Sequence, residues 1–176
     1  QDGWQDVLLA GQGAGTARVQ MIYTNIAGQS FAPLHPTGLP EGTVFPDILD
    51  WADFANQGGL DVLATNSFAL QLHFNHGGVL EYTGNELSYF GWSLLSHSVA
   101  DVNGDGRLDV FMSAASPFDS WNTLSTVWTN LGGNQFQHQL GEIRYRTSAH
   151  AWGDVNNDGT AELILTGAFQ TGGQTY

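Results

Sequence analysis

Two nine-residue segments of the chain carry side-chain oxygens at alternating positions, a spacing that suits the binding of a hard cation. The first runs from Asp101 to Asp109 and reads DVNGDGRLD, and the second runs from Asp154 to Glu162 and reads DVNNDGTAE. Acidic or amide residues occupy positions 1, 3, 5 and 9 of both segments, and glycine occupies position 6. Alternate residues of a tight loop turn their oxygens inward, glycine permits the bend, and the carbonyl group of position 7 adds a ligand. The spacing therefore predicts two calcium sites.

The residues after each segment distinguish these sites from a helix–loop–helix calcium site. An EF-hand loop ends in a bidentate Glu at position 12, but Met112 and Leu165 stand at that position, inside runs that read as strands. We therefore expect strand–loop–strand sites. The alternative is a turn that merely favours Asp, Asn and Gly. Two copies in one register of a repeat favour calcium over that alternative.

Two further segments match the pattern less well. Asp53–Asp61 keeps acids at positions 1 and 9, but it has Ala55 at position 3 and the neutral Gln57 at position 5. We expect weak calcium binding there, or none. Asp2–Asp6 matches only positions 5 to 9. Ten of the 17 acidic residues lie in the four segments: Asp2, Asp6, Asp53, Asp61, Asp101, Asp105, Asp109, Asp154, Asp158 and Glu162.

The elements around these segments repeat along the chain. The acids that begin the apolar runs, at positions 6, 61, 109 and 162, are 55, 48 and 53 residues apart. After each of the first three runs comes a second strand-like run that closes on an asparagine, then a glycine turn and an apolar residue. Four short strands in a unit of about 50 residues is the arithmetic of a β-propeller blade. With 23 glycines and 12% charged residues, the chain is predicted to be all-β, with blades of four antiparallel strands.

This pattern resembles the FG-GAP/VCBS repeat, in which Asp-x-Asn-x-Asp-Gly-x-x-Asp precedes an apolar strand. Such repeats build the integrin alpha-chain β-propeller and many secreted bacterial and fungal proteins. The resemblance covers essentially the whole chain as about three and a half repeats, and its most specific stretch is residues 151–159. We expect one partial propeller domain with units at 1–43 (partial), 44–90, 91–141 and 142–176 (partial).

The resemblance implies that each calcium loop joins the first and second strands of a blade. It also implies a ligand set that combines side-chain oxygens with the backbone oxygens of Arg107 and Thr160. The implied side-chain ligands are Asp101, Asn103, Asp105, Asp109, Asp154, Asn156, Asp158 and Glu162.

Composition excludes several functional classes. The net charge is −13, with four basic residues, all of them arginine. A nucleic-acid binder or a basic membrane-surface protein needs clustered cations. No apolar run approaches the 18 residues of a membrane span, and without cysteine there is no disulfide framework. The first residues carry no signal-peptide pattern, so we expect any signal peptide to have been removed.

The histidines and acid pairs do not form a recognisable catalytic constellation. His73 and His76 lie on one predicted strand and face opposite sides. His97 and His150 precede Asp101 and Asp154 by four residues each, which favours a structural role in the blade. No sequence feature places the close acid pairs across a cleft: Asp47 with Asp50, and Glu81 with Glu86. We therefore expect no enzymatic activity and no catalytic residues.

The aromatic residues divide into two groups. Trp51, Trp152 and the apolar Val99 each stand two residues before the first acid of a loop, a register that predicts packing between blades. Trp121 lies in segment 116–122, which the other repeats do not reproduce. An exposed Trp beside Asp and Asn suits a sugar-binding surface, whereas a loop that folds its own aromatic residues inward is the alternative.

Three functions remain open at this point. The first is a secreted or cell-surface calcium-binding module for adhesion, recognition or structural assembly. The others are a carbohydrate-binding lectin and an accessory propeller of a secreted polysaccharide-active enzyme. Two complete blades leave strand edges open, so we expect further blades or other copies of the chain to pair there. A glycan or an extracellular protein is the other expected partner.

Overall fold

The computed structural model describes residues 2–12, 18–34, 49–65, 69–88, 91–119, 122–139, 146–168, 170–171 and 174–175. Every regular element within these ranges is a β-strand, so the prediction of an all-β chain is confirmed. No helix in the described part of the chain is long and apolar enough to cross a membrane.

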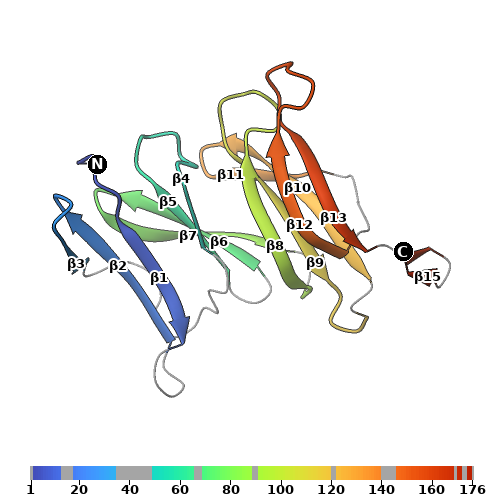
Figure 1. Ribbon diagram of the computed structural model, residues 1–176, viewed down its shortest axis with the longest axis horizontal. Coiled ribbons are helices and arrows are strands. Elements are labelled where there is room, and N and C mark those ends of the chain that lie inside the picture. The colour runs from blue at the N-terminus through green and yellow to red at the C-terminus, as the bar shows by residue number, and fades with distance from the viewer. Residues whose placement is uncertain are drawn as a thin grey trace.

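The strands form antiparallel sheets in which each strand pairs with its neighbours in sequence (Figure 1). The first sheet has three strands: β1 (Val7–Gln12), β2 (Arg18–Ile26) and β3 (Ser30–Leu34). The second has four: β4 (Leu49–Ala52), β5 (Asp61–Thr65), β6 (Ala69–His76) and β7 (Val79–Ser88). The third also has four: β8 (Ser93–Ala100), β9 (Asp109–Ala115), β10 (Thr123–Gly132) and β11 (Gln135–His138). The fourth has β12 (Arg146–Gly153) and β13 (Glu162–Ala168), and a short hairpin follows with β14 (Gln170–Thr171) and β15 (Gln174–Thr175).

A glycine turn connects the third and fourth strands of the second sheet. Gly77 and Gly78 join β6 to β7 with φ of 66° and 95°, and a two-residue turn with positive φ at both positions matches the twist of the flanking strands. The turn is held from the preceding strand, because Asn75 Oδ1 accepts the N–H of Gly78 at 2.8 Å.

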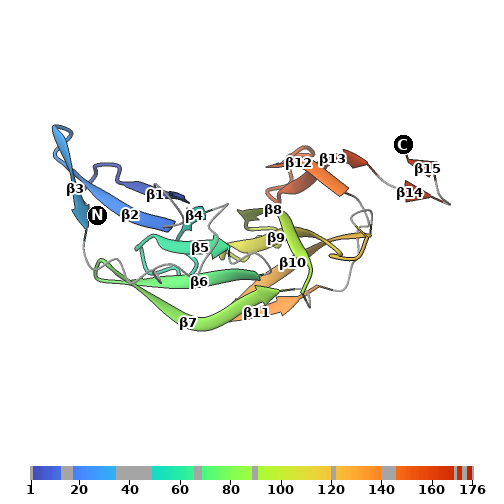
Figure 2. The same ribbon diagram turned by 90° about the horizontal axis from the view of Figure 1, so that it is seen from below.

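The four sheets lie side by side in sequence order, as blades along an open arc (Figure 2). The second and third sheets share a buried apolar cluster that includes Leu63, Leu72, Val110 and Met112. A smaller cluster, with Ile22, Val62, Ala64 and Leu80, joins the first and second sheets. The second and third sheets span 49–88 and 93–138, inside the units expected at 44–90 and 91–141; the unit bounds themselves stay a prediction.

Trp152, which stands two residues before its loop, packs between blades as predicted. Its ring meets that of Phe111 edge-on at 6.3 Å, and its Nε1 donates to Ser98 Oγ at 2.9 Å. Val99 packs against the larger apolar cluster, and Trp51 packs against the smaller one. The equivalent positions of three blades therefore all contribute to the core.

Candidate cation-binding loops

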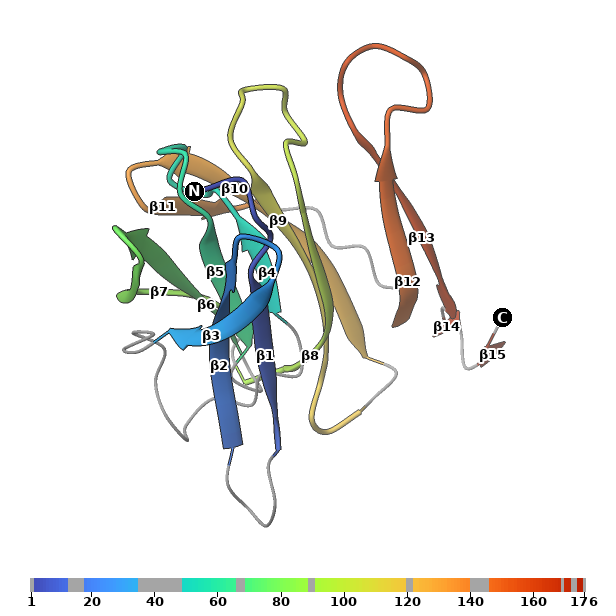
Figure 3. The ribbon, with the colours of Figure 1, turned by 60° about the vertical axis from the view of Figure 1, so that its left-hand side comes forward.

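Each acidic segment forms a loop between the first and second strands of its sheet, as expected. The segments between β4 and β5, β8 and β9, and β12 and β13 lie along the same edge of the row of blades (Figures 1 and 3). The last two lie close together, because a Cβ built on Gly104 would lie 3.8 Å from Thr160 Cγ2. Two strongly acidic loops are therefore neighbours at this edge.

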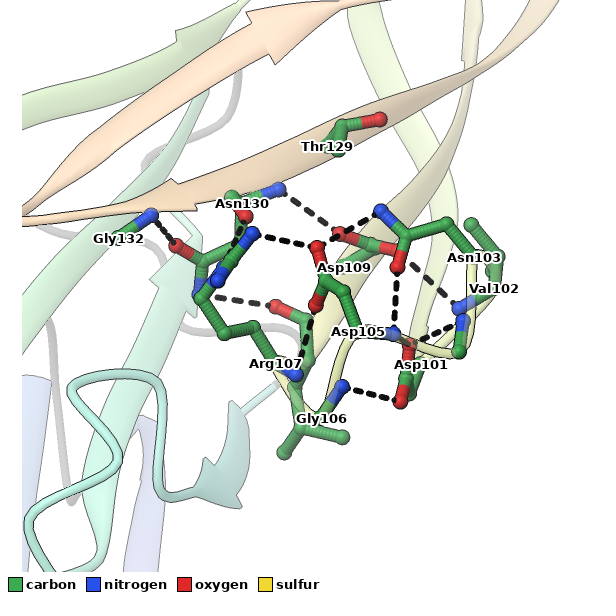
Figure 4. A network of polar contacts seen from close by, with 12 residues as sticks. Asp101, Val102, Asn103, Asp105, Gly106, Arg107, Asp109, Thr129, Asn130 and Gly132 are labelled. Carbon is green, nitrogen blue, oxygen red and sulfur yellow. Dashed lines mark hydrogen bonds and ion pairs between the residues drawn. The ribbon is translucent and has the colours of Figure 1, made fainter.

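Asp101 organises the backbone of loop 101–109 (Figure 4). Its Oδ1 accepts the N–H groups of Gly104 and Asp105 at 2.8 and 3.1 Å. Its Oδ2 accepts the N–H of Gly106 at 2.8 Å. Asn103 Oδ1 accepts the N–H of Asp105 at 3.0 Å. The carboxylate at position 1 therefore folds the loop around itself, which explains why the pattern begins with Asp.

Asp105 is paired with a cation from its own loop. Its Oδ2 lies 2.5 Å from Arg107 Nη2 and accepts Asn103 Nδ2–H at 2.9 Å. Its Oδ1 accepts the backbone N–H of Arg107 at 2.9 Å. The Nε–H of Arg107 donates to the carbonyl oxygen of Asn130 on β10 at 2.8 Å. The guanidinium is thus fixed between the loop and the second strand that follows it.

Loop 154–162 repeats this geometry without the cation. Asp154 accepts the N–H groups of Asp158 and Gly159 at 3.0 and 2.8 Å, and Asn156 Oδ1 accepts the N–H of Asp158 at 2.9 Å. At position 7 stands Thr160, whose hydroxyl and N–H both donate to Asp158 Oδ1. These hydrogen bonds from Thr160 lower the pKa of the Asp158 carboxyl.

The acid at position 9 of loop 101–109 ties the loop to β10, the third strand of its sheet. Asp109 is fully buried, and its Oδ2 and Oδ1 accept the N–H groups of Val102 and Asn130 at 3.1 and 2.8 Å. Asn130 in turn donates to the carbonyl oxygen of Leu108 and accepts the N–H of Gly132, at 3.2 and 2.9 Å. Burial raises the pKa of Asp109, against the lowering effect of these N–H groups.

The same arrangement recurs in the two preceding blades. Asp61 accepts the N–H of Asn75 at 2.8 Å, and burial raises its pKa. Asp6 accepts the N–H of Asn25 at 2.8 Å. An asparagine thus closes the same strand of each of these blades, and its role is not evident from the sequence of any one blade. The recurrence at one register was the available signal.

Loop 53–61 is held by packing with the next blade. Phe54, at position 2, is 3% exposed, and its ring meets Phe136 edge-on at 6.4 Å. Its carbonyl oxygen accepts Asn130 Nδ2–H at 3.0 Å. Asp53 accepts the N–H groups of Gln57 and Gly58 at 2.9 and 2.7 Å. An apolar side chain therefore fixes this loop, which has no side-chain oxygen at position 3 and a neutral amide at position 5.

The donor sets of the two complete loops fit a hard cation by their chemistry. Each supplies three carboxylates and an amide, the oxygen ligands that calcium prefers, and in loop 101–109 a guanidinium already stands in as the cation. Among the described residues, no three His, Asp or Glu side chains converge to hold a metal ion. The carboxylates of each loop instead accept hydrogen bonds from N–H groups. The ligand set itself stays a prediction.

The remaining sequence candidates lie away from the loops. His73 is fully buried and His76 is exposed, on opposite faces of β6. His97 Nε2 lies 2.8 Å from Asp50 Oδ2 of the neighbouring blade, and His150 Nε2 lies 3.0 Å from the carbonyl oxygen of His97, so both histidines join blades. Asp47 and Trp121 lie outside the described residues.

A cleft of about 1140 Å³ opens between the first and second sheets, at the end that carries the loops. The residues that line it include Trp4, Trp51, Asp6 and Asn75. Trp4 packs on Gly28, where a Cβ would lie 2.6 Å from the indole Cζ3, so only glycine leaves room for the ring. The cleft thus joins aromatic faces with hydrogen-bonding groups.

Comparison with known proteins agrees with this geometry. A family model for the FG-GAP-like repeat matches residues 53–112, from the first acid of loop 53–61 into β9. Over 97 residues the chain is 31% identical to integrin alpha-PS3 of Drosophila melanogaster, a match that covers 50% of this chain and 8% of that protein. The chain therefore contains an FG-GAP-like repeat at residues 53–112, and its repeated four-stranded sheets, with acidic loops between their first two strands, agree with a β-propeller type of fold.

Proposed function

We propose that this chain is an extracellular, calcium-binding propeller module that serves adhesion, recognition or structural assembly. The observation that carries the proposal is the pair of neighbouring loops with all-oxygen donor sets on one edge of the blades. The similarity to an integrin alpha chain supports a recognition role and a location outside the cell or at its surface. We propose that the module itself is not catalytic.

Calcium would act at these loops by neutralising carboxylates. Asp101 and Asp154 hold their loop backbones in a bend that gathers the acids, and Asp109 links loop 101–109 to β10. Like charges this close repel one another unless a cation or a hydrogen-bond donor compensates them. A bound calcium ion would supply that compensation and would fix β8 to β9 and β12 to β13 at their loop ends.

Thermal unfolding in calcium and in chelator tests the proposal. Extracellular calcium modules bind with dissociation constants of about 0.1–1 mM, and at 100 times the dissociation constant a site stabilises the fold by roughly 2.7 kcal/mol. We expect a clearly higher melting temperature in calcium than in chelator, with magnesium as the control cation. Identical curves in calcium and chelator would contradict calcium binding.

The outer faces of the blade row support packing against further blades or another copy of the chain. On β1, Leu8 packs inward and Leu9 is 52% exposed. On β13, Ile164 is 55% exposed and pairs with Ala151, on the face opposite Trp152. Exposed aliphatic side chains on the outer face of a terminal sheet are the kind of surface that a neighbouring blade covers.

Carbohydrate binding is the second candidate function, and the cleft between the first two sheets favours it. Indole faces pack against the C–H groups of a sugar ring, while acids and amides bind its hydroxyl groups. Glycan-array binding that is lost in Trp4→Ala, with Phe118→Ala as an exposed control outside the cleft, would support a lectin. Absence of binding to any glycan would remove this candidate and leave the calcium-binding module unaffected.

A further inference from the structure

The two complete loops differ in charge at a single ligand position. Loop 101–109 has three acids and Arg107, whereas loop 154–162 has three acids and no basic residue, with Thr160 at position 7. The number of ligand charges is one of the properties that set calcium affinity in such loops. The contacts of Arg107 place its charge directly on one of the expected ligands, Asp105.

We infer that Arg107 is a built-in counterion that competes with calcium, so that loop 154–162 binds the cation more tightly than loop 101–109. The inference rests on the proposed calcium binding and assigns a ranking to its two sites. It makes Arg107 the residue that sets the difference in affinity.

The position of the guanidinium is fixed by more than its charge. Its Nε–H donates to the Asn130 carbonyl oxygen at 2.8 Å, and its Cδ lies 3.6 Å from the place of a Cβ on Gly132. Arg107 is thus held against β10, with its Nη2 on Asp105 Oδ2. A divalent cation that binds the same carboxylate meets an adjacent positive charge, so the guanidinium must move away or the cation binds less well.

Loop 154–162 offers no such competitor. Thr160 donates its hydroxyl group to Asp158 but carries no charge. The loop is exposed from Asp154 to Gly159, and within the part of the chain that the structure describes its acids have only hydrogen-bond donors to offset their repulsion. It therefore gains more from a cation than loop 101–109, in which Asp105 already has one.

The two loops also differ in what holds them when calcium is absent. Arg107 bridges its loop to β10 in the cation-free state, whereas no basic side chain reaches Asp158 among the described residues. Once chelator has removed calcium from both loops, loop 154–162 should therefore be the looser of the two, while Arg107 keeps loop 101–109 largely in place.

Calorimetric titration with calcium chloride, at fixed ionic strength, tests the ranking on the full chain. Asp158→Ala removes one site and leaves loop 101–109 to be measured alone. In that background Arg107→Thr, which copies the residue of the neighbouring loop, should tighten calcium binding about three- to tenfold. Arg107→Lys keeps the charge and should stay close to the parent. In the reciprocal background, Asp105→Ala, the substitution Thr160→Arg should weaken binding by a similar factor.

A second measurement separates competition from a general effect on folding. In chelator, Arg107→Thr should lower the melting temperature, since it removes the bridge to β10, although the same substitution tightens calcium binding. If the chain binds calcium but its affinity is the same with and without Arg107, the inference is wrong and the proposed calcium binding stands. If the unsubstituted chain gives no calcium signal at all, the proposed function fails and the inference fails with it.

Discussion

The side chain of Asn130 donates a hydrogen bond to the carbonyl oxygen of Phe54, 76 residues earlier in the chain, at 3.0 Å. The donor belongs to the third blade and the acceptor to the loop of the second. The same side chain also bonds Leu108 and Gly132 within its own blade. One buried amide therefore joins a loop, a turn and the neighbouring blade.

Replacing Asn130 by Ala should destabilise the fold by about 2–4 kcal/mol, because it leaves buried donors and acceptors without partners. Asn25 makes the equivalent bonds within the first blade but is only partly buried, so Asn25→Ala should cost about 1 kcal/mol or less. Urea unfolding of the two variants measures the difference. Equal losses would show that the link between blades adds nothing.

Removing a predicted ligand should matter more in a complete loop than in a degraded one. Asp105→Ala should cancel most of the stabilisation that calcium gives to loop 101–109, while Asp53→Ala should leave the calcium response unchanged, since loop 53–61 has no side-chain oxygen at position 3 and only a neutral amide at position 5. Differential scanning calorimetry in calcium and in chelator gives both responses. The prediction is wrong if the two variants respond alike.

Acid should destabilise the chain through His73. Burial lowers the pKa of His73 to about 4, from an ordinary value of 6.5, and neither ring nitrogen has a hydrogen-bond partner among the described residues. The unfolded chain takes up the proton near pH 6.5 and the folded chain only near pH 4. The contribution of His73 to the free energy of unfolding is therefore complete above pH 6.5. It decreases by about 3 kcal/mol as the pH falls through 4.

The comparison of the parent chain with His73→Leu isolates this effect. Asp61 and Asp109 have a raised pKa, so they contribute with the opposite sign: their share of stability is lost as the pH rises from 3.8 through the raised value. Both acids remain in the variant, and their contribution therefore cancels in the difference. We expect the free energy of unfolding of His73→Leu to fall less between pH 7 and pH 4.5, with chelator present throughout. The exposed His76→Leu serves as the control.

Association through the outer faces should depend on their aliphatic side chains. Leu9→Ser and Ile164→Ser together should shift sedimentation toward the monomer, because they remove exposed apolar area from both outer faces. Phe118→Ser alters a residue that is 96% exposed in a loop and should have no such effect. A parent chain that sediments as a single monomer at all concentrations would refute the association.

Sequence predicts best what recurs locally in the chain. The loop spacing, the strand order and the packing of Trp152 all follow from a register repeated in each blade. The role of Phe54 does not, because its buried position depends on Phe136 and Asn130 of the next blade. For Arg107 the sequence predicts only a ligand role of the backbone carbonyl, since nothing in its local sequence shows that the side chain reaches Asp105 and β10.

The junctions between successive blades differ in how they are built. The second and third sheets share a large apolar cluster, and Trp152 docks on Phe111 between the third and fourth, but a cleft opens between the first and second. In the described part of the chain each blade contacts only the adjacent blades, so a pulling force passes through the junctions one after another. The force at which the row breaks is therefore set by its weakest junction. Under mechanical load the first blade would therefore detach before the others separate.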